Sequence, residues 1–157
     1  MRKWLVTTIV ICLVIAVPLG VIAATTQFRS RLERQRAVAR SGAVATSNQD
    51  WRTVRGMRRL VCSIHEVSVA VSLDVKGAPV QFRILQDSGP TLEPGRARFD
   101  PDGTTSSFAY NFVGNTGTFE GLDDHVFELQ WRSPTGDQVE LRAASMNLLF
   151  EKGDCTL

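Results

Sequence analysis

From Leu60 onward, apolar side chains recur at every second position, and this alternation restricts the possible folds more than any other feature. Successive side chains of a β-strand point to opposite faces, so alternation predicts strands that have one face in a core. Turn sequences rich in Asp, Gly, Pro and Ser separate the alternating segments. Those segments are PVQFRILQ, SSFAYNFV, HVFELQWR, QVELRA and SMNLLFE. Because the strands are short and the turns frequent, we expect an all-β, antiparallel β-sandwich over residues 60–157.

The alternation changes phase once, near His65 and Glu66. Apolar residues occupy even positions up to Ile64 and odd positions from Val67. A strand keeps its inward face only if an extra residue or a new strand intervenes at such a slip. The sequence therefore predicts either a bulge or a junction of two strands at this point.

An uncharged, apolar run occupies Trp4–Ala24, directly after two basic residues. A helix of this length spans the hydrocarbon core of a bilayer. Two interpretations remain open for residues 1–24: a signal anchor retained as a transmembrane helix, or a cleaved signal peptide. Pro18 and Gly20 favour cleavage, whereas the length of the run and the basic segment after it favour the anchor. We therefore expect the β domain to be preceded by an N-terminal hydrophobic helix.

Residues 25–59 form a basic segment with nine arginines against two acidic residues, a net charge of +7, whereas residues 60–157 carry −7. We expect a juxtamembrane linker, helical as far as about Arg40, with small polar residues over 41–50. Attraction to anionic lipid head groups and a simple solvated spacer are both open interpretations. The residues expected at the membrane surface are Arg29, Arg31, Arg34, Arg36 and Arg40. No nucleic-acid partner is expected, because no RNA-binding motif accompanies the arginines.

Cys62 and Cys155 bracket the predicted β domain. A disulfide between them would close a loop of more than 90 residues and stabilise the fold by about 4–5 kcal/mol. Disulfides persist outside the cytoplasm, and this argument opposes the positive-inside rule, which places the arginine-rich side in the cytoplasm. We expect the disulfide and an extracytoplasmic domain. Cys12 lies within the apolar run, where a lipoprotein anchor is not expected.

Few residues suggest catalysis. His65 and His125 each have acidic neighbours, but neither shows the spacing of a zinc enzyme. His125 is expected to open a strand after a turn. No nucleophile elbow, phosphate loop or dinucleotide fingerprint occurs. We therefore predict that the chain is not an enzyme and holds no cofactor or metal.

Two weaker candidates are binding features. The acidic turns with Asp100 and Asp102 and with Asp123 and Asp124 offer clustered oxygens for calcium, although ordinary turns have the same composition. Aromatic rings stack on sugars when they are exposed. The rings considered for such a platform are Tyr110, Trp131 and Phe119. Tyr110 and Trp131 lie on the apolar faces of their segments, so we expect both in the core.

The stretch from His125 to Phe150, with a histidine, alternating apolar residues, Gln-Trp-Arg, a glycine turn and a last apolar strand, resembles the closing strands of jelly-roll-like β-sandwiches. Such domains occur in secreted bacterial and phage proteins. Ser107–Phe112 also suits such a domain. The resemblance implies architecture only, because these folds host many functions.

Together these features predict a membrane-anchored or secreted envelope protein, single-pass if residues 4–24 stay in the bilayer. Its extracytoplasmic β-sandwich is expected to act as a non-enzymatic binding or structural module for an unknown protein or glycan. The alternative function is a carbohydrate-binding or calcium-dependent adhesion domain.

Overall fold

The computed structural model describes residues 32–39, 43–116 and 124–152, and of residues 32–39 it describes the backbone only. Every regular element in these ranges is a β-strand. The strands are β1 (Leu32–Ala39), β2 (Val44–Thr46), β3 (Arg52–Gly77), β4 (Val80–Gln86), β5 (Ala97–Phe99), β6 (Ser106–Asn115), β7 (Asp124–Arg132) and β8 (Val139–Lys152). The all-β class predicted from the alternation is confirmed.

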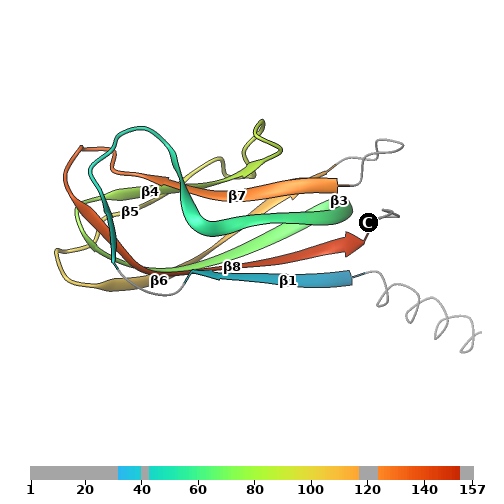
Figure 1. The fold of residues 1–157 in the computed structure, drawn as a ribbon, viewed down its shortest axis with the longest axis horizontal. Helices are drawn as coiled ribbons and strands as arrows, with labels where there is room; N and C mark the ends of the chain where they lie inside the picture. Colours follow the sequence, from blue (N-terminus) through green and yellow to red (C-terminus); the bar gives the residue numbers. More distant parts are fainter. Residues whose placement is uncertain (1–31, 40–42, 117–123, 153–157) are drawn as a thin grey trace, which may run out of the picture. The chain divides into compact units, whose positions relative to one another are not determined.

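β3 belongs to two sheets and joins them. Its first half pairs with β7, which continues to β4 and β5; we call this the β7 sheet. Its second half pairs with β6 on one side and β8 on the other, and β1 and β2 lie beyond β8; we call this the β8 sheet. The pairings among β2 to β8 are antiparallel. In Figure 1, β4, β5 and β7 form one layer, β6 and β8 form the other, and β3 turns from the first into the second.

The turn within β3 lies at the predicted phase slip. Its pairing with β8 shifts register between Ile64 and Val67. Within this interval His65 adopts a φ of 60°, a left-handed conformation that a bulge uses to redirect a strand. The predicted irregularity near His65 and Glu66 is therefore confirmed as a bulge inside one long strand.

A single apolar core lies between the two sheets. The alternating residues expected to face inward do so in β4, β7 and β8, and Phe82, Phe127 and Phe150 are at most 1% exposed. The ring of Phe82 in β4 lies 6.0 Å, centroid to centroid, from that of Phe108 in β6. This contact joins the two layers directly, so the sheets share one packed interior.

The open side of the two layers is partly bridged. The segment after β4 makes an isolated pairing between Glu93 and Val113 of β6, with both backbone hydrogen bonds formed. Leu92 is buried beside this bridge. Its Cγ lies 2.8 Å from where a Cβ of Gly114 would be, so only glycine fits there without a shift. The antiparallel sheet is thus nearly closed.

The predicted boundary at residue 60 is too late, and over residues 32–39 a strand stands where a helix was predicted. Residues 32–39 form β1, residues 44–46 form β2 on the edge of β8, and residues 52–59 begin β3. Between Thr53 and Arg58 the pairing with β7 is interrupted, and Val54 and Met57 enter the core there. Much of the segment expected to be a linker therefore belongs to the β domain.

Residues 4–24 lie outside the described residues, so the anchor and the signal peptide both remain predictions. Within the described ranges, no helix is long and apolar enough to cross a membrane.

Candidate functional site

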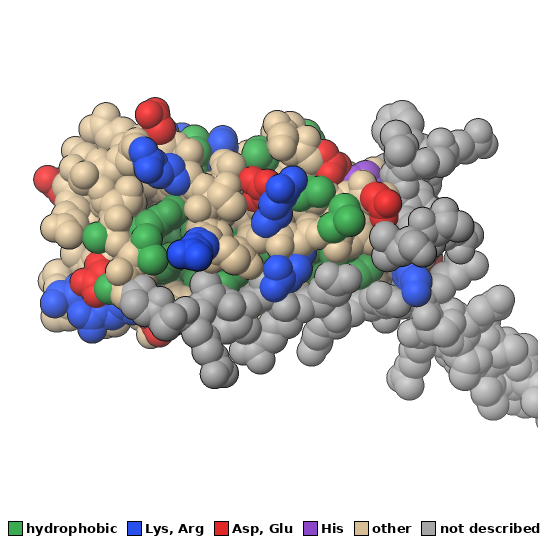
Figure 2. Space-filling view, viewed as in Figure 1, with side chains coloured by type: hydrophobic (Ala, Val, Ile, Leu, Met, Phe, Trp, Pro, Cys, Tyr) green, Lys and Arg blue, Asp and Glu red, His purple; other side chains and the backbone are tan. Residues whose placement is uncertain are grey.

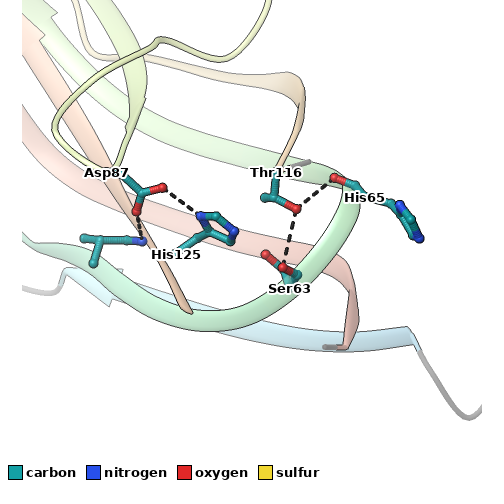
Figure 3. A network of polar contacts seen from close by, with 6 residues as sticks. Ser63, His65, Asp87, Thr116 and His125 are labelled. Carbon is teal, nitrogen blue, oxygen red and sulfur yellow. Dashed lines mark hydrogen bonds and ion pairs between the residues drawn. The ribbon is translucent and has the colours of Figure 1, made fainter. Parts of the chain in front are cut away.

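His125 is held by a carboxylate that lies 38 residues away in the sequence. It is the second residue of β7, as expected, and its Nδ1 lies 2.7 Å from Oδ2 of Asp87, in the turn after β4. The other oxygen of Asp87 accepts a hydrogen bond of 2.7 Å from the Val126 backbone N–H. The Asp87 N–H donates in return to the Val126 carbonyl at 2.9 Å. Figure 3 shows this reciprocal pairing, which fastens the β4 turn to the start of β7.

The carboxylate of Asp87 is kept ionised by these contacts. Partial burial raises its pKa, but the hydrogen bonds from His125 and Val126 outweigh that effect and leave the pKa below its ordinary value. A carboxylate only accepts hydrogen bonds, so Nδ1 of His125 carries the proton and donates it. The His125 side chain is 12% exposed and that of Asp87 is 40% exposed. The pair is therefore an oriented, partly buried dyad.

A hydrolytic triad adds a hydroxyl nucleophile to an Asp–His pair. Ser63 is a candidate, because it lies in β3 two residues after Val61, which pairs with His125. Its Oγ is buried and has no hydrogen-bond partner, but the residue is 0% exposed, so a substrate could not reach it. Thr116 is committed elsewhere, because its hydroxyl donates to the His65 carbonyl at 3.0 Å. In Figure 3 the exposed His65 side chain points away from His125. The two histidines do not converge on one site.

The carboxylates of the Asp100–Asp102 turn are used within the protein. Asp100 pairs with Arg98 at 3.1 Å. Asp102 accepts hydrogen bonds from both the backbone N–H and the hydroxyl of Thr104, which hold its pKa below the ordinary value. Asp124 begins β7 as an exposed residue, and Asp123 lies outside the described residues. Among the described residues, no three His, Cys, Asp or Glu side chains gather closely enough to hold a metal.

The three candidate sugar-stacking rings have different environments. Trp131 is 3% exposed and packs in the core, as expected. The expectation that Tyr110 lies in the core is wrong: it is 38% exposed at the edge strand β6, where its ring meets Phe99 edge-on at 6.4 Å. Phe119 lies outside the described residues. A row of exposed rings is thus not formed by the residues described here, and Tyr110 alone presents a large part of its ring.

A second group of side chains lies on the outer face of the β7 sheet. Trp51, directly before β3, lies beside two arginines: the guanidinium carbon of Arg83 is 4.4 Å from the ring centroid and that of Arg132 is 4.6 Å. Nε of Arg83 donates to Gln130 at 2.8 Å, and Nε of Arg132 donates to Gln81 at 2.9 Å. We call Trp51, Arg83 and Arg132 the arginine–tryptophan cluster. Each guanidinium group of the cluster is thus held by a ring contact and a side-chain hydrogen bond.

The residues predicted at the membrane surface are not tested by the structure. Arg29, Arg31 and Arg40 lie outside the described residues, and Arg34 and Arg36 lie in β1, where only the backbone is described. On the face drawn in Figure 2, Lys and Arg side chains are spaced apart by hydrophobic and uncharged groups rather than gathered in one patch.

The predicted disulfide is likewise open. Cys62 is 8% exposed in β3, and Cys155 lies outside the described residues. Ser63 pairs with Lys152 near the end of β8, and two residues separate Lys152 from Cys155. The end of β8 therefore lies beside Ser63, the neighbour of Cys62 in the chain, and the bridge stays a prediction.

Sequence reasoning missed Asp87, Arg83 and Arg132 as possible site residues. Arg83 and Arg132 occupied the expected outward positions of two alternating segments, which ordinarily are solvated. The sequence does not show that β4 pairs with β7. This pairing places Gln81 opposite Arg132 and Arg83 opposite Gln130. The only local signal is the shared Gln-aromatic-Arg pattern of the two segments, Gln81 to Arg83 and Gln130 to Arg132.

No protein-family model matches the chain, and no curated protein sequence is similar to it. Similar folds occur among solved structures. The structure of the Gx strain of infectious bursal disease virus aligns with a TM-score of 0.52 and 15% identity over 79% of this chain and 33% of that chain. The VP2 subviral particle of the same virus aligns with a TM-score of 0.47 and 14% identity, over 79% of this chain and 34% of that chain. The C-terminal domain of EclA, a sugar-binding protein, aligns with a TM-score of 0.42 and 8% identity, over 69% of this chain and 79% of that chain.

At these identities the likeness concerns the fold alone. The Gx strain structure supports a β-sandwich architecture for the described domain. The chain spans about a third of the length of the two viral chains. What those whole proteins do is therefore not transferred to this chain.

Proposed function

We propose that this chain is an envelope protein, anchored through residues 4–24 or secreted after their removal, whose jelly-roll-like domain is a non-enzymatic binding module outside the cytoplasm. The observation that carries this proposal is the outer face of the β8 sheet. The middle of this face, across β6, β3 and β8, is built from small or uncharged residues, and we call this stretch the uncharged face. Charged residues border it, among them Glu66 and Asp74 of β3 and Glu151 of β8. The members of the uncharged face are Ser68, Ala70, Ser72, Ala109, Asn111, Val113, Ala143, Ser145, Asn147 and Leu149.

The register places the apolar members of this face in one row. Val113 and Leu149 both lie opposite Ser68, on its two sides, and they are 49% and 41% exposed. The outer face of a soluble β-sheet ordinarily carries many charged side chains. The centre of a protein–protein interface, by contrast, is depleted of charge. The uncharged face therefore fits contact with another protein better than contact with water.

The test is photo-crosslinking of the full chain in its native membrane or secreted setting. A photo-crosslinking side chain replaces Ala70, at the centre of the uncharged face, and in a matched variant it replaces Thr135, exposed in the β7–β8 turn. We expect a discrete protein adduct from position 70 and none from position 135. Adding Ala143→Arg should abolish the adduct without lowering the melting temperature, because position 143 points outward. Equal adducts at both positions, or none at position 70, would refute the proposal.

Carbohydrate binding is the second candidate, favoured by the half-exposed ring of Tyr110 beside Phe99. Stacking on a sugar would quench or shift the tyrosine signal and would be lost in Tyr110→Ala. Calcium-dependent adhesion has less support, because Asp100 and Asp102 are engaged by Arg98 and Thr104.

A further inference from the structure

Two arginines of the β7 sheet are held in fixed positions with most of their donors unused. A guanidinium has five N–H donors in a planar fork. Arg83 uses Nε for Gln130, and Arg132 uses Nε for Gln81 and Nη1 for the Gln49 carbonyl at 3.4 Å. Gln81 is only 8% exposed, so its position is fixed by packing. The glutamines thus orient both forks through Nε and leave the remaining donors available at the surface.

The charge of this pair is not neutralised by a carboxylate. The ion pairs of the described residues near this face join Arg58 to Glu128 and Arg98 to Asp100, and neither Arg83 nor Arg132 has such a partner there. Burial and the nearby charge of Arg132 lower the pKa of Arg83. The ring of Trp51 offsets part of this repulsion through cation–π contacts with both arginines. Two like charges in one place are nevertheless costly unless a counter-charge binds.

We propose that the arginine–tryptophan cluster is a binding site for the carboxylate or sulfate group of an acidic polysaccharide. A single guanidinium fork matches the two oxygens of such a group, and the second arginine adds positive charge beside it. The Gln130 side chain accepts from Arg83 through Oε1, which leaves its amide N–H groups to meet sugar hydroxyls. This combination of charged forks, an amide donor and an aromatic ring distinguishes a saccharide from a bare lipid phosphate. The site lies on the opposite sheet from the uncharged face and does not depend on that proposal.

The experiment titrates the full-length chain in neutral detergent with a heparin-derived oligosaccharide, a uronate oligosaccharide and inorganic sulfate, at fixed ionic strength. Binding is followed by calorimetry and by the NMR signal of the Trp51 indole N–H. Arg83→Gln and Arg132→Gln are the test variants. Arg142→Gln is the matched control, because it removes the same charge from the β8 sheet and breaks only a solvent-accessible pair with Glu140.

We expect at least one acidic oligosaccharide to bind and to shift the Trp51 signal, with sulfate competing at higher concentration. Arg83→Gln and Arg132→Gln should each weaken binding about tenfold, and Arg142→Gln less than about twofold. The melting temperature of each variant shows that it is folded. Equal losses in all three variants would mean non-specific charge attraction and would overturn the proposal. Tighter binding to anionic phospholipid vesicles than to either oligosaccharide, or binding to neither, would also overturn it.

Discussion

At the scale of single residues, the Asp87–His125 dyad links the turn after β4 to the start of β7. Asp87 receives hydrogen bonds from His125 and from the Val126 backbone, and returns one to Val126. The turn holding Asp87 is strained, with φ values of 51° at Asp87 and 58° at Ser88. These contacts explain why two non-glycine residues keep left-handed conformations there.

Asp87→Asn should therefore destabilise the domain at neutral pH, by about 1 kcal/mol once the 40% exposure of Asp87 is allowed for. Because the folded-state pKa of Asp87 lies below its unfolded value, the stabilisation is present above the unfolded pKa and is lost as pH falls through the folded one. Thermal melts of wild type and variant should differ at pH 7 and converge below about pH 4. A gap that stays constant down to pH 3 would show that the ionised carboxylate is not responsible.

The core offers a second residue-scale test at Phe82, which is 1% exposed and contacts rings of both β5 and β6. Phe82→Ala should cost about 3–5 kcal/mol in unfolding free energy, because it leaves a cavity between the layers. Denaturant titration gives the value. Tyr110→Ala, at the exposed end of the same aromatic group, should cost clearly less.

At the scale of elements, β3 and its connections determine the architecture. The strand enters the β7 sheet, turns at the His65 bulge and continues in the β8 sheet. Its last residue, Gly77, adopts a φ of 105°. A Cβ at Gly77 would lie 2.6 Å from the Gln138 backbone carbonyl oxygen. This close approach is where β3 ends beside the start of β8.

Gly77→Ala should be strongly destabilising, by about 3 kcal/mol, because it combines an unfavourable φ with a collision against backbone. Gly103→Ala is the control: its φ is 85°, but nothing lies within 4 Å of the added methyl group. That change should cost only about 1–2 kcal/mol. Similar melting temperatures for the two variants would contradict the close packing of β3 against β8.

Strands were predictable where alternation was regular and were missed where it was not. The segments of β4, β7 and β8 show unbroken alternation, and each forms a strand with the expected inward face. In the first half of β3, Val54 and Met57 enter the core from an interruption of the pairing, so no period of two is visible. β2 and β5 have three residues each, which is too short for a pattern. The Asp87–His125 contact depends on the pairing of β4 with β7 and could not be found locally.

At the scale of the whole molecule, the domain is a nearly closed, two-layer β structure whose outer faces differ in chemistry. The β8 sheet presents an uncharged outer face, and the β7 sheet presents the arginine–tryptophan cluster. Because the fold alone does not indicate a partner, the two hypotheses about partners rest on this difference between the outer faces.

The corrected boundary of the domain is itself testable. A chain lacking residues 1–59 should fail to fold cooperatively, because it loses the larger part of the pairing of β3 with β7 and the buried side chains of Val54 and Met57. A chain lacking residues 1–31 keeps every described strand and should show a sharp thermal transition. Cooperative melting of the shorter chain would restore the boundary at residue 60.

The central claim is that the β domain lies outside the cytoplasm, and the state of Cys62 and Cys155 tests it most directly. The native protein is extracted, denatured without reductant, alkylated and weighed by intact-mass spectrometry, then reduced and alkylated again. We predict that only Cys12 is labelled before reduction if residues 1–24 are retained, or no cysteine if they are removed, and that two further labels appear after reduction. Labelling of Cys62 and Cys155 before any reduction would contradict the account and place the domain in a reducing compartment.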